Sequence, residues 1–373
     1  MLDVAVLGGG LIGCATARLL ARAGLRVALF ERGRIGGEAS GAAAGMLGVQ
    51  SESADDVALR LGLRSRALYP ALLEALADET GMRVECWREG TLGVAFTPAD
   101  TALLDRRLAM LAAAGAAGEA VPRARLRTLE PALSHGARGG ALFPLDGRLD
   151  PVALTTALAR AAGVAGCTLY EGEEVRSVVV ERGAVVGVVT AARRLACSAA
   201  VNAMGAWAGR VRGMTALPVQ PMRGQIAVVQ APRPPLRHAL RTPRGYAVAR
   251  RDGRVLFGST RESVGYRKQV TAGGLSGVLG AALELTPALC RLPLVASWSG
   301  LRPATADGRP IVSLDPLVRH YVVATGHDAD GVLLAPLSAE LAAGLLRGER
   351  SEWDEVLSVT RFAGAGAGAA LTL

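Results

Sequence analysis

The segment that most constrains the fold is a glycine-rich loop near the start of the chain. An apolar run over residues 3–7 leads into Gly8, Gly10 and Gly13, which form a GxGxxG pattern where a helix-like stretch begins. A second apolar run ends at Glu31. In a strand–helix–strand unit these glycines allow a tight turn, a close approach of the backbone to pyrophosphate, and close helix–strand packing. The sequence therefore predicts a dinucleotide-binding unit.

Glu31 and the start of the helix define the two ends of this expected site. The carboxylate follows the loop by about twenty residues, where it can hold the ribose hydroxyls of an adenosine. The first helical amides, at Leu11 and Ile12, face the phosphates. Arg32 comes next to Glu31, but the acid disfavours a 2′-phosphate and hence NADP. The motif does not separate FAD from NAD, and the alternative is a glycine-rich turn in an unrelated α/β fold.

Length and composition narrow the class of protein. A chain of 373 residues exceeds what one core usually serves, so two domains are expected. The net charge of +9 comes almost entirely from dispersed arginines, with Lys268 the only lysine, so nucleic acid is not an expected partner. The cysteines and histidines are isolated and show no metal-ligand spacing, so we expect neither a disulfide framework nor a metal site. No signal peptide or transmembrane run is evident, and a cytoplasmic protein is expected.

The hydrophobic pattern predicts a mixture of helices and strands. Residues 84–97 indicate strand, turn and strand, and residues 173–201 indicate three antiparallel strands that run into a fourth. Strands are also expected over residues 225–260, 295–301 and 321–325. Helices are expected over residues 11–23, 56–79, 99–113, 272–283 and 331–346. The repetitive end, residues 363–373, is expected to be a flexible tail.

Four further segments carry a family resemblance. They are GGEASGAAAGML (36–47), VNAMGAWAG (201–209), WSGLRPATADGRPIV (298–312) and VVATGHDADGVLLAP (322–336). With the N-terminal motif and in this order, they resemble the D-amino acid oxidase-like FAD-dependent oxidoreductases, most of all the glycine oxidase branch of thiamine biosynthesis. The resemblance covers nearly the whole chain.

This resemblance implies an α/β fold with an α+β substrate part. A Rossmann-like FAD-binding domain of the glutathione reductase/D-amino acid oxidase type is expected beside a second, mixed-sheet domain. The FAD-binding domain would comprise residues 1–85, 148–215 and 299–362. The substrate-binding domain would comprise residues 86–147 and 216–298.

The resemblance also implies which residues contact FAD. The sarcosine oxidase branch attaches its flavin through a cysteine, and Gly300 stands in the corresponding stretch here, so the FAD is expected to be non-covalent. The expected contacts are Gly8, Gly10, Leu11, Ile12, Gly13, Glu31, Arg32, Ala39, Ser40, Ala43, Ala44, Gly45, Met46, Val175, Ala203, Gly205, Trp207, Arg302, His327, Asp330, Gly331, Val332 and Leu333.

For the substrate end, the resemblance implies a carboxylate clamp. Arg302 matches the family's carboxylate-binding arginine, and Tyr246 matches a tyrosine that also meets the carboxylate. The sequence departs from the family in Asp328-Ala329-Asp330, where an aromatic residue, arginine and asparagine are usual. We hypothesise that Arg261 replaces the lost arginine; the alternative is a surface arginine at a strand end. The two acids could instead favour a substrate with a second cationic group.

The expected reaction is oxidative deamination of glycine or another small amine or amino acid. Hydride transfer to FAD would give the imine, and O2 would reoxidise the flavin with release of H2O2. One alternative is a D-amino acid dehydrogenase that passes electrons to a quinone. Another is a non-catalytic FAD-binding subunit of an amine-oxidising complex. The sequence leaves the oligomeric state open, a homo-oligomer included.

Overall fold

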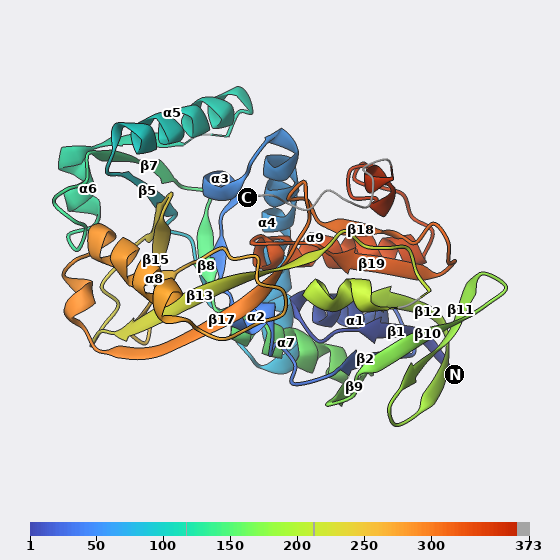
Figure 1. Ribbon diagram of the computed structural model, residues 1–373. Helices are drawn as coiled ribbons and strands as arrows, with labels where there is room; N and C mark the ends of the chain where they lie inside the picture. The colour runs from blue at the N-terminus through green and yellow to red at the C-terminus, as the bar shows by residue number, and fades with distance from the viewer. Residues whose placement is uncertain (117, 212, 364–373) are drawn as a thin grey trace.

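A computed structural model of the chain describes residues 1–116, 118–211 and 213–363. Two large sheets lie side by side, one formed mainly by the N-terminal, central and C-terminal segments and the other by the segments between them (Figure 1). The first occupies the right half of that view and the second the left half. The predicted tail, residues 363–373, falls outside the described residues except for Ala363.

The first sheet has eight strands and contains the predicted N-terminal unit. Its central strands β1, β2, β9, β12 and β19 pair in parallel, whereas β10, β11 and β18 are antiparallel additions. The strands are β1 (Leu2–Leu7), β2 (Val27–Glu31), β9 (Thr168–Glu171), β10 (Val175–Glu181), β11 (Ala184–Thr190), β12 (Arg194–Asn202), β18 (Ile311–Leu314) and β19 (Tyr321–Thr325).

Helices cover one face of this sheet. α1 packs against both α7 and α9, and α4 packs against α9. Their apolar side chains form one core with the sheet, to which α1 contributes Leu11, Cys14, Ala15, Ala17, Leu20 and Ala21. The helices are α1 (Leu11–Arg22), α4 (Asp56–Thr80), α7 (Pro151–Val164) and α9 (Gly331–Leu346). The short helices α2 (Ala39–Ala42) and α3 (Val49–Glu52) pack against α7 and α4.

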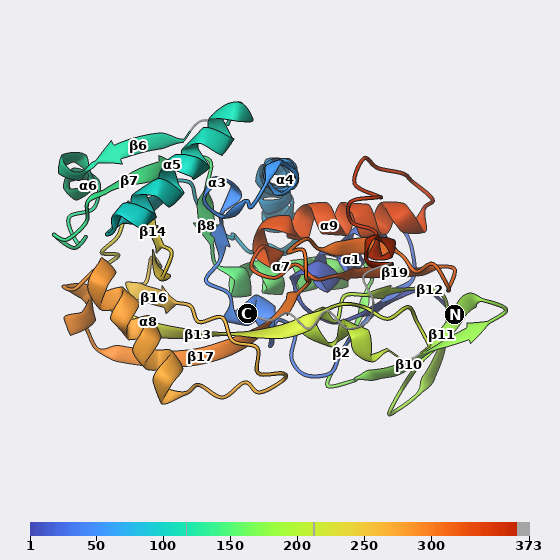
Figure 2. The ribbon, with the colours of Figure 1, turned by 45° about the horizontal axis from the view of Figure 1, so that its top comes forward.

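The second sheet also has eight strands, in the order β17-β13-β16-β15-β14-β5-β7-β6, and all pairs are antiparallel except β14–β5. Figure 2 shows α5 and α6 beside β6 and β7, with α8 along the opposite end of the sheet. The elements are β5 (Thr91–Ala95), α5 (Pro98–Ala113), β6 (Glu119–Pro122), α6 (Arg123–Leu129), β7 (Gly139–Phe143), β13 (Gln220–Gln230), β14 (Ala239–Thr242), β15 (Gly245–Ala249), β16 (Arg254–Gly258), α8 (Ala272–Leu285) and β17 (Leu294–Ala304).

A small sheet and three short helices complete the described chain. The small sheet joins the two halves in the order β3-β8-β4. The remaining elements are β3 (Met46–Leu47), β4 (Cys86–Trp87), β8 (Gly147–Leu149) and the 3-10 helices η1 (Gly205–Arg210), η2 (Leu289–Arg291) and η3 (Val359–Phe362). In the part of the chain that the structure describes, no helix combines the length and the apolar character needed to cross a membrane.

The predicted elements are present, but two pairings differ from the expectation. Residues 84–97 do hold two strands around Gly90, yet β4 joins the small sheet and β5 the large one. Gly90 has a φ of 89°, and a Cβ there would lie 2.8 Å from the Phe143 carbonyl oxygen, so the chain turns sharply between the two strands. Residues 173–201 form three strands and not four, because β12 is one long strand. It pairs with β11 at its start and with β19 at its end.

The division into two domains remains a proposal. Every strand of the first sheet lies within the expected FAD-binding segments, but β17 runs across the proposed boundary between residues 298 and 299. It pairs with β13 along almost its whole length, from Leu294 to Ala304. The segment that carries Arg302 is therefore a strand of the second sheet. Arg302 stands near the end of this strand, where the second sheet approaches the first (Figure 1).

Candidate functional site

An open groove of about 1010 Å³ runs from the carboxyl ends of β1 and β2 to the start of α9. Ligands of open parallel sheets bind at this edge, where the helical N-termini point. The groove brings together most of the predicted cofactor contacts. Those that line it are Gly8, Gly10, Leu11, Ile12, Glu31, Arg32, Ala39, Ser40, Ala43, Val175, Ala203, Gly205, Trp207, His327, Gly331 and Val332.

The glycine loop has no room for side chains. Gly8 has a φ of 105°, and a Cβ there would lie 2.5 Å from the Ala203 carbonyl oxygen. A Cβ on Gly13 would lie 1.9 Å from the Gly8 carbonyl oxygen, so this residue serves helix–strand packing and does not line the groove. Gly10 is the N-cap of α1 and provides no side-chain cap. The Ser40 hydroxyl accepts from the Leu11 amide at 2.9 Å, and the following amides of the first turn of α1 are left for a phosphate.

Glu31 closes the other side of this loop. One carboxylate oxygen accepts a hydrogen bond from the Gly9 amide at 2.9 Å, and the other accepts from the Gly33 amide at 2.8 Å. The side chain is thus held at the end of β2, with lone pairs left for a ribose. The Arg32 guanidinium lies 3.7 Å from the centre of the Trp207 ring, and these two residues line the same end of the groove.

The far end of the groove meets the N-terminus of α9. Asp330 is the N-cap, but its side chain makes no capping hydrogen bond, so the amides from Gly331 onward are open to a negatively charged group. His327 lies just before, within 2.8 Å of the Ser338 hydroxyl. Burial lowers the pKa of His327 to about 4, so the imidazole is neutral at physiological pH.

A second pocket adjoins the groove and contains the predicted carboxylate clamp. The two cavities share Ala39, Ala43, Asp328, Ala329 and Val332. The second is lined by Ala39, Ala42, Ala43, Ala44, Gly45, Met46, Glu52, Gly224, Ile226, Tyr246, Gly300, Arg302, Asp328, Ala329 and Val332. Arg302 thus belongs to this pocket and not to the groove. Leu333 and Asp330 line neither, since Leu333 is buried in the helical core.

The Arg302 guanidinium has only neutral partners. It lies over Gly224, where an added Cβ would come within 2.4 Å of Nη1. Nη2 donates to the Ser259 hydroxyl at 2.5 Å, and Nη1 donates to the Thr260 carbonyl oxygen at 3.2 Å. No carboxylate among the described residues forms an ion pair with it. This cation is therefore available for a ligand carboxylate.

Tyr246 leans toward Arg302 from β15. Its ring lies over Gly258 of the neighbouring strand β16, where an added Cβ would be 2.4 Å from the hydroxyl oxygen. Burial raises the pKa of Tyr246, so the hydroxyl keeps its proton and can donate it in a hydrogen bond. The glycines on β13 and β16 thus make room for both heads of the clamp.

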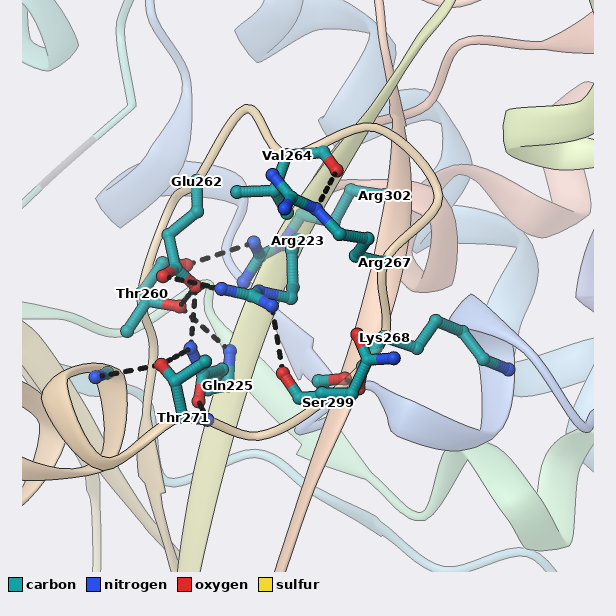
Figure 3. A network of polar contacts seen from close by, with 12 residues as sticks. Arg223, Gln225, Thr260, Glu262, Val264, Arg267, Lys268, Thr271, Ser299 and Arg302 are labelled. Atoms are coloured by element: carbon teal, nitrogen blue, oxygen red, sulfur yellow. Dashed lines mark hydrogen bonds and ion pairs between the residues drawn. The ribbon is translucent and has the colours of Figure 1, made fainter.

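A network of polar contacts holds the loop that supports Arg302 (Figure 3). Glu262 accepts two hydrogen bonds from the Arg223 guanidinium, at 3.0 and 2.9 Å, and one from the Gln225 amide at 2.7 Å. The hydrogen bonds from Arg223 lower the pKa of Glu262 to about 2. The segment that supplies Thr260 to Arg302 is consequently tied to β13.

The acids of the departing loop have different environments. Asp328 lines both cavities, and its two oxygens accept from Arg261 Nη1 at 3.0 and 2.8 Å. Arg261 itself is half exposed and lines neither cavity. Asp328 therefore balances the charge of Arg261. Asp330 differs, because burial and the charges of Glu52 and Asp328 raise its pKa to about 8.

Sequence reasoning missed Glu52, Gly224 and Gly258. A lone glycine inside a strand pattern signals a close approach, and this signal could have identified the two glycines. Glu52 had no such signal, because only the tertiary fold brings α3 to the pocket. Within the described residues, no group of three or more His, Cys, Asp and Glu side chains is placed to hold a metal ion.

A dinucleotide groove beside a smaller pocket that holds an arginine is the arrangement expected of an oxidoreductase. Comparison with known proteins specifies the class further. A family model described as FAD dependent oxidoreductase matches residues 3–345. The chain belongs to this family.

Individual relatives match over almost the whole chain. Glycine oxidase from Geobacillus kaustophilus (strain HTA426) is 38% identical over 97% of both chains. A crystal structure of glycine oxidase from Geobacillus kaustophilus covers 96% of this chain and 98% of that one, with a TM-score of 0.92 and 37% identity. Hydrogen cyanide synthase subunit HcnC from Pseudomonas aeruginosa (strain PAO1) is 30% identical over 93% of both chains.

The residues present fit FAD. The side-chain-free loop at Gly8 and Gly10, the carboxylate of Glu31, and the starts of α1 and α9 are spread along one continuous groove. A dinucleotide with phosphates in its middle and a ring system that becomes negatively charged at one end matches this order of partners.

Proposed function

We propose that this protein oxidises glycine or another small amine or amino acid to the imine, with non-covalent FAD and with O2 as the electron acceptor. The observation that carries the proposal is Arg302, which has no acidic partner among the described residues and lines a pocket next to the dinucleotide groove. The similarity to glycine oxidases over almost the whole chain supports the substrate class.

In this proposal Arg302 and Tyr246 hold the substrate carboxylate. A guanidinium binds a carboxylate through two parallel hydrogen bonds, and a protonated phenol adds a third. Since Arg302 comes from the first strand of the sheet order and Tyr246 from the fourth, two separate elements fix the carboxylate from different sides. The substrate then has one orientation, and its α carbon faces the groove.

The remaining chemistry needs position and a dry environment more than reactive side chains. FAD, when bound, supplies the acceptor for the hydride of the α C–H bond. Ile226, Val332 and Ala43 provide apolar walls that exclude water from the reacting bond. His327 is neutral and adds no positive charge that would repel a substrate amine.

The positions of the cysteines support the proposal that the FAD is bound without a covalent bond. None of the chain's five cysteines lines the groove or the second pocket, and Gly300 occupies the pocket wall. Acid precipitation of the yellow protein should leave a colourless pellet and a yellow supernatant. A yellow pellet after washing in denaturant would show a covalent bond.

The test is anaerobic reduction of the bound flavin. Glycine, sarcosine, D-amino acids and diamines are added singly to the holoprotein without oxygen, and absorbance near the flavin band is followed. Bleaching by glycine or another small amino acid supports the proposal. A flavin that dithionite reduces but that no amine bleaches would refute it.

The same experiment on the holoprotein distinguishes two alternative functions. If the substrate bleaches the flavin but air restores it only slowly while a quinone restores it fast, the chain is a dehydrogenase. The similarity to the hydrogen cyanide synthase subunit favours, as a second candidate, a role as one subunit of an amine-oxidising complex. That role predicts bound FAD with no bleaching by any amine in the isolated chain.

A further inference from the structure

Glu52 is a charged wall of the second pocket, on the side of Tyr246 that faces away from Arg302. Its partner Arg241 belongs to β14, which pairs with β15, and Arg241 is the cross-strand neighbour of Tyr246. The Arg302 guanidinium instead lies over Gly224 of β13. The strand under Arg302, β13, and the strand that carries Arg241, β14, are three strand spacings apart in the sheet order β13-β16-β15-β14. At about 4.8 Å for each spacing this is about 14 Å between strand axes.

The position of Glu52 is built into the fold. It ends the short helix α3, in which the amides of Gln50 and Ser51 donate to the buried Asp146 carboxylate at 2.6 and 3.3 Å. The Glu52 side chain folds back over Gly48, where an added Cβ would be 2.6 Å from its Cγ. Residues on both sides of Glu52 therefore restrict where its carboxylate lies.

One oxygen of this carboxylate is committed and the other is free. Oε1 accepts from Arg241 Nη1 at 2.5 Å, and Oε2 has no hydrogen-bond partner among the described residues. The side chain is only 9% exposed. Because Glu52 lines the pocket, a donor that enters the pocket can reach this oxygen and replace water there.

We propose that Glu52 binds a second amine of the substrate, so that the preferred substrates are amino acids with a terminal amine on a side chain of about three carbons. This inference rests on the proposed function, because the same Arg302 and Tyr246 hold the carboxylate. In glycine the nitrogen and the carboxylate carbon are about 2.5 Å apart, whereas in 2,5-diaminopentanoate the distal nitrogen reaches about 6 Å. With about 4 Å from the guanidinium carbon to the carboxylate carbon and about 3 Å for the hydrogen bond to Glu52, the longer molecule covers about 13 Å, close to the separation of β13 and β14, whereas glycine covers about 9.5 Å.

The charges that line the pocket agree with a cationic far end. Glu52 and Asp328 line it, whereas their partners Arg241 and Arg261 do not. A substrate therefore meets one cation at Arg302 and carboxylates elsewhere. An acidic side chain would meet these carboxylates instead, so glutamate should bind worse than an uncharged amino acid of equal length.

The test uses two ligands that lack an α-amine. Dissociation constants of 5-aminopentanoate and of hexanoate, which has a methyl group in place of the terminal amine, are measured from the shift of the bound flavin spectrum. One charge-assisted hydrogen bond predicts about ten- to a hundredfold tighter binding of 5-aminopentanoate. Equal dissociation constants would overturn the inference while leaving oxidation of glycine untouched.

Two variants should change this preference in opposite directions. Glu52→Gln should bring the ratio of the two constants to about one, and Arg241→Met should increase it, because the carboxylate then loses the guanidinium that is hydrogen-bonded to it. General damage to the pocket would weaken both ligands in both variants and leave the ratio unchanged. Glu352→Gln, which breaks an exposed pair with Arg60, is the matched control and should leave the ratio at its original value.

Kinetics then separate this inference from the proposed function. We expect kcat/KM for 2,5-diaminopentanoate to exceed that for 2-aminohexanoate, with both enantiomers tested, and the excess to vanish in Glu52→Gln. If 5-aminopentanoate binds tightly but no amino acid reduces the flavin, the proposed function fails and the amine site stands. If glycine and 2-aminohexanoate are oxidised as well as the diamino acid, the amine site fails alone.

Discussion

Replacing Arg302 with methionine tests the carboxylate clamp directly. Within the part of the chain that the structure describes, the guanidinium donates only to the Ser259 hydroxyl and the Thr260 carbonyl oxygen, so its remaining N–H groups can bind the substrate. A hydrogen bond to a charged group is worth about 1.5–3 kcal/mol, and the clamp offers two. The loss is about 3–6 kcal/mol, which corresponds to a fall in kcat/KM of about two to four orders of magnitude.

The assay is designed to distinguish lost binding from lost folding. Initial rates of peroxide formation are measured for glycine and for an amine without a carboxylate, at matched FAD content. Arg302→Met should depress the first rate and leave the second within about threefold. Arg254→Met, on another strand of the same sheet and paired with Asp252, is the control and should change neither. If the Arg302→Met variant keeps the kcat/KM of the parent for glycine, Arg302 does not hold the substrate carboxylate.

Three further outcomes follow from the same structure. Gly13→Ala places a Cβ 1.9 Å from the Gly8 carbonyl oxygen, so we expect loss of FAD from the purified protein, whereas Gly277→Ala, in open space, should retain it. Tyr246→Phe removes one hydrogen bond of about 1–2 kcal/mol and should raise KM for glycine by about five- to thirtyfold, with a smaller rise contradicting its assigned role. The pKa of Asp330 is raised to about 8, so the folded state holds a proton that the unfolded state loses near pH 4. Stability should therefore fall as pH rises from about 4 to 8, by more than about 1 kcal/mol, and Asp330→Asn should flatten the melting temperature over that range.

The dinucleotide half was predictable because its signals are local. Gly8 has a positive φ and Gly13 packs against the Gly8 carbonyl oxygen, so both positions require glycine, and Glu31 ends the next strand. Each requirement leaves a mark in the sequence at a fixed spacing. The same holds for the long helices, whose boundaries lie within about two residues of the expected ones.

The substrate half was less predictable because it depends on contacts between distant segments. Arg261 pairs with Asp328 across 67 residues, and Glu52 pairs with Arg241 across 189. Neither pairing has a periodic pattern or a fixed spacing. The hypothesis that Arg261 replaces a lost arginine did not anticipate that Asp328 would take up its charge.

The stoichiometry of glycine oxidation tests the proposed reaction most directly. The purified holoprotein is mixed with glycine in air, and oxygen uptake, peroxide, ammonia and glyoxylate are measured together. We expect equal amounts of all four, because one two-electron oxidation to the imine is followed by hydrolysis. Turnover should be abolished or greatly reduced in Arg302→Met. Ammonia without peroxide, or no ammonia from glycine or from any amino acid of the panel despite full FAD occupancy, would contradict the proposed reaction.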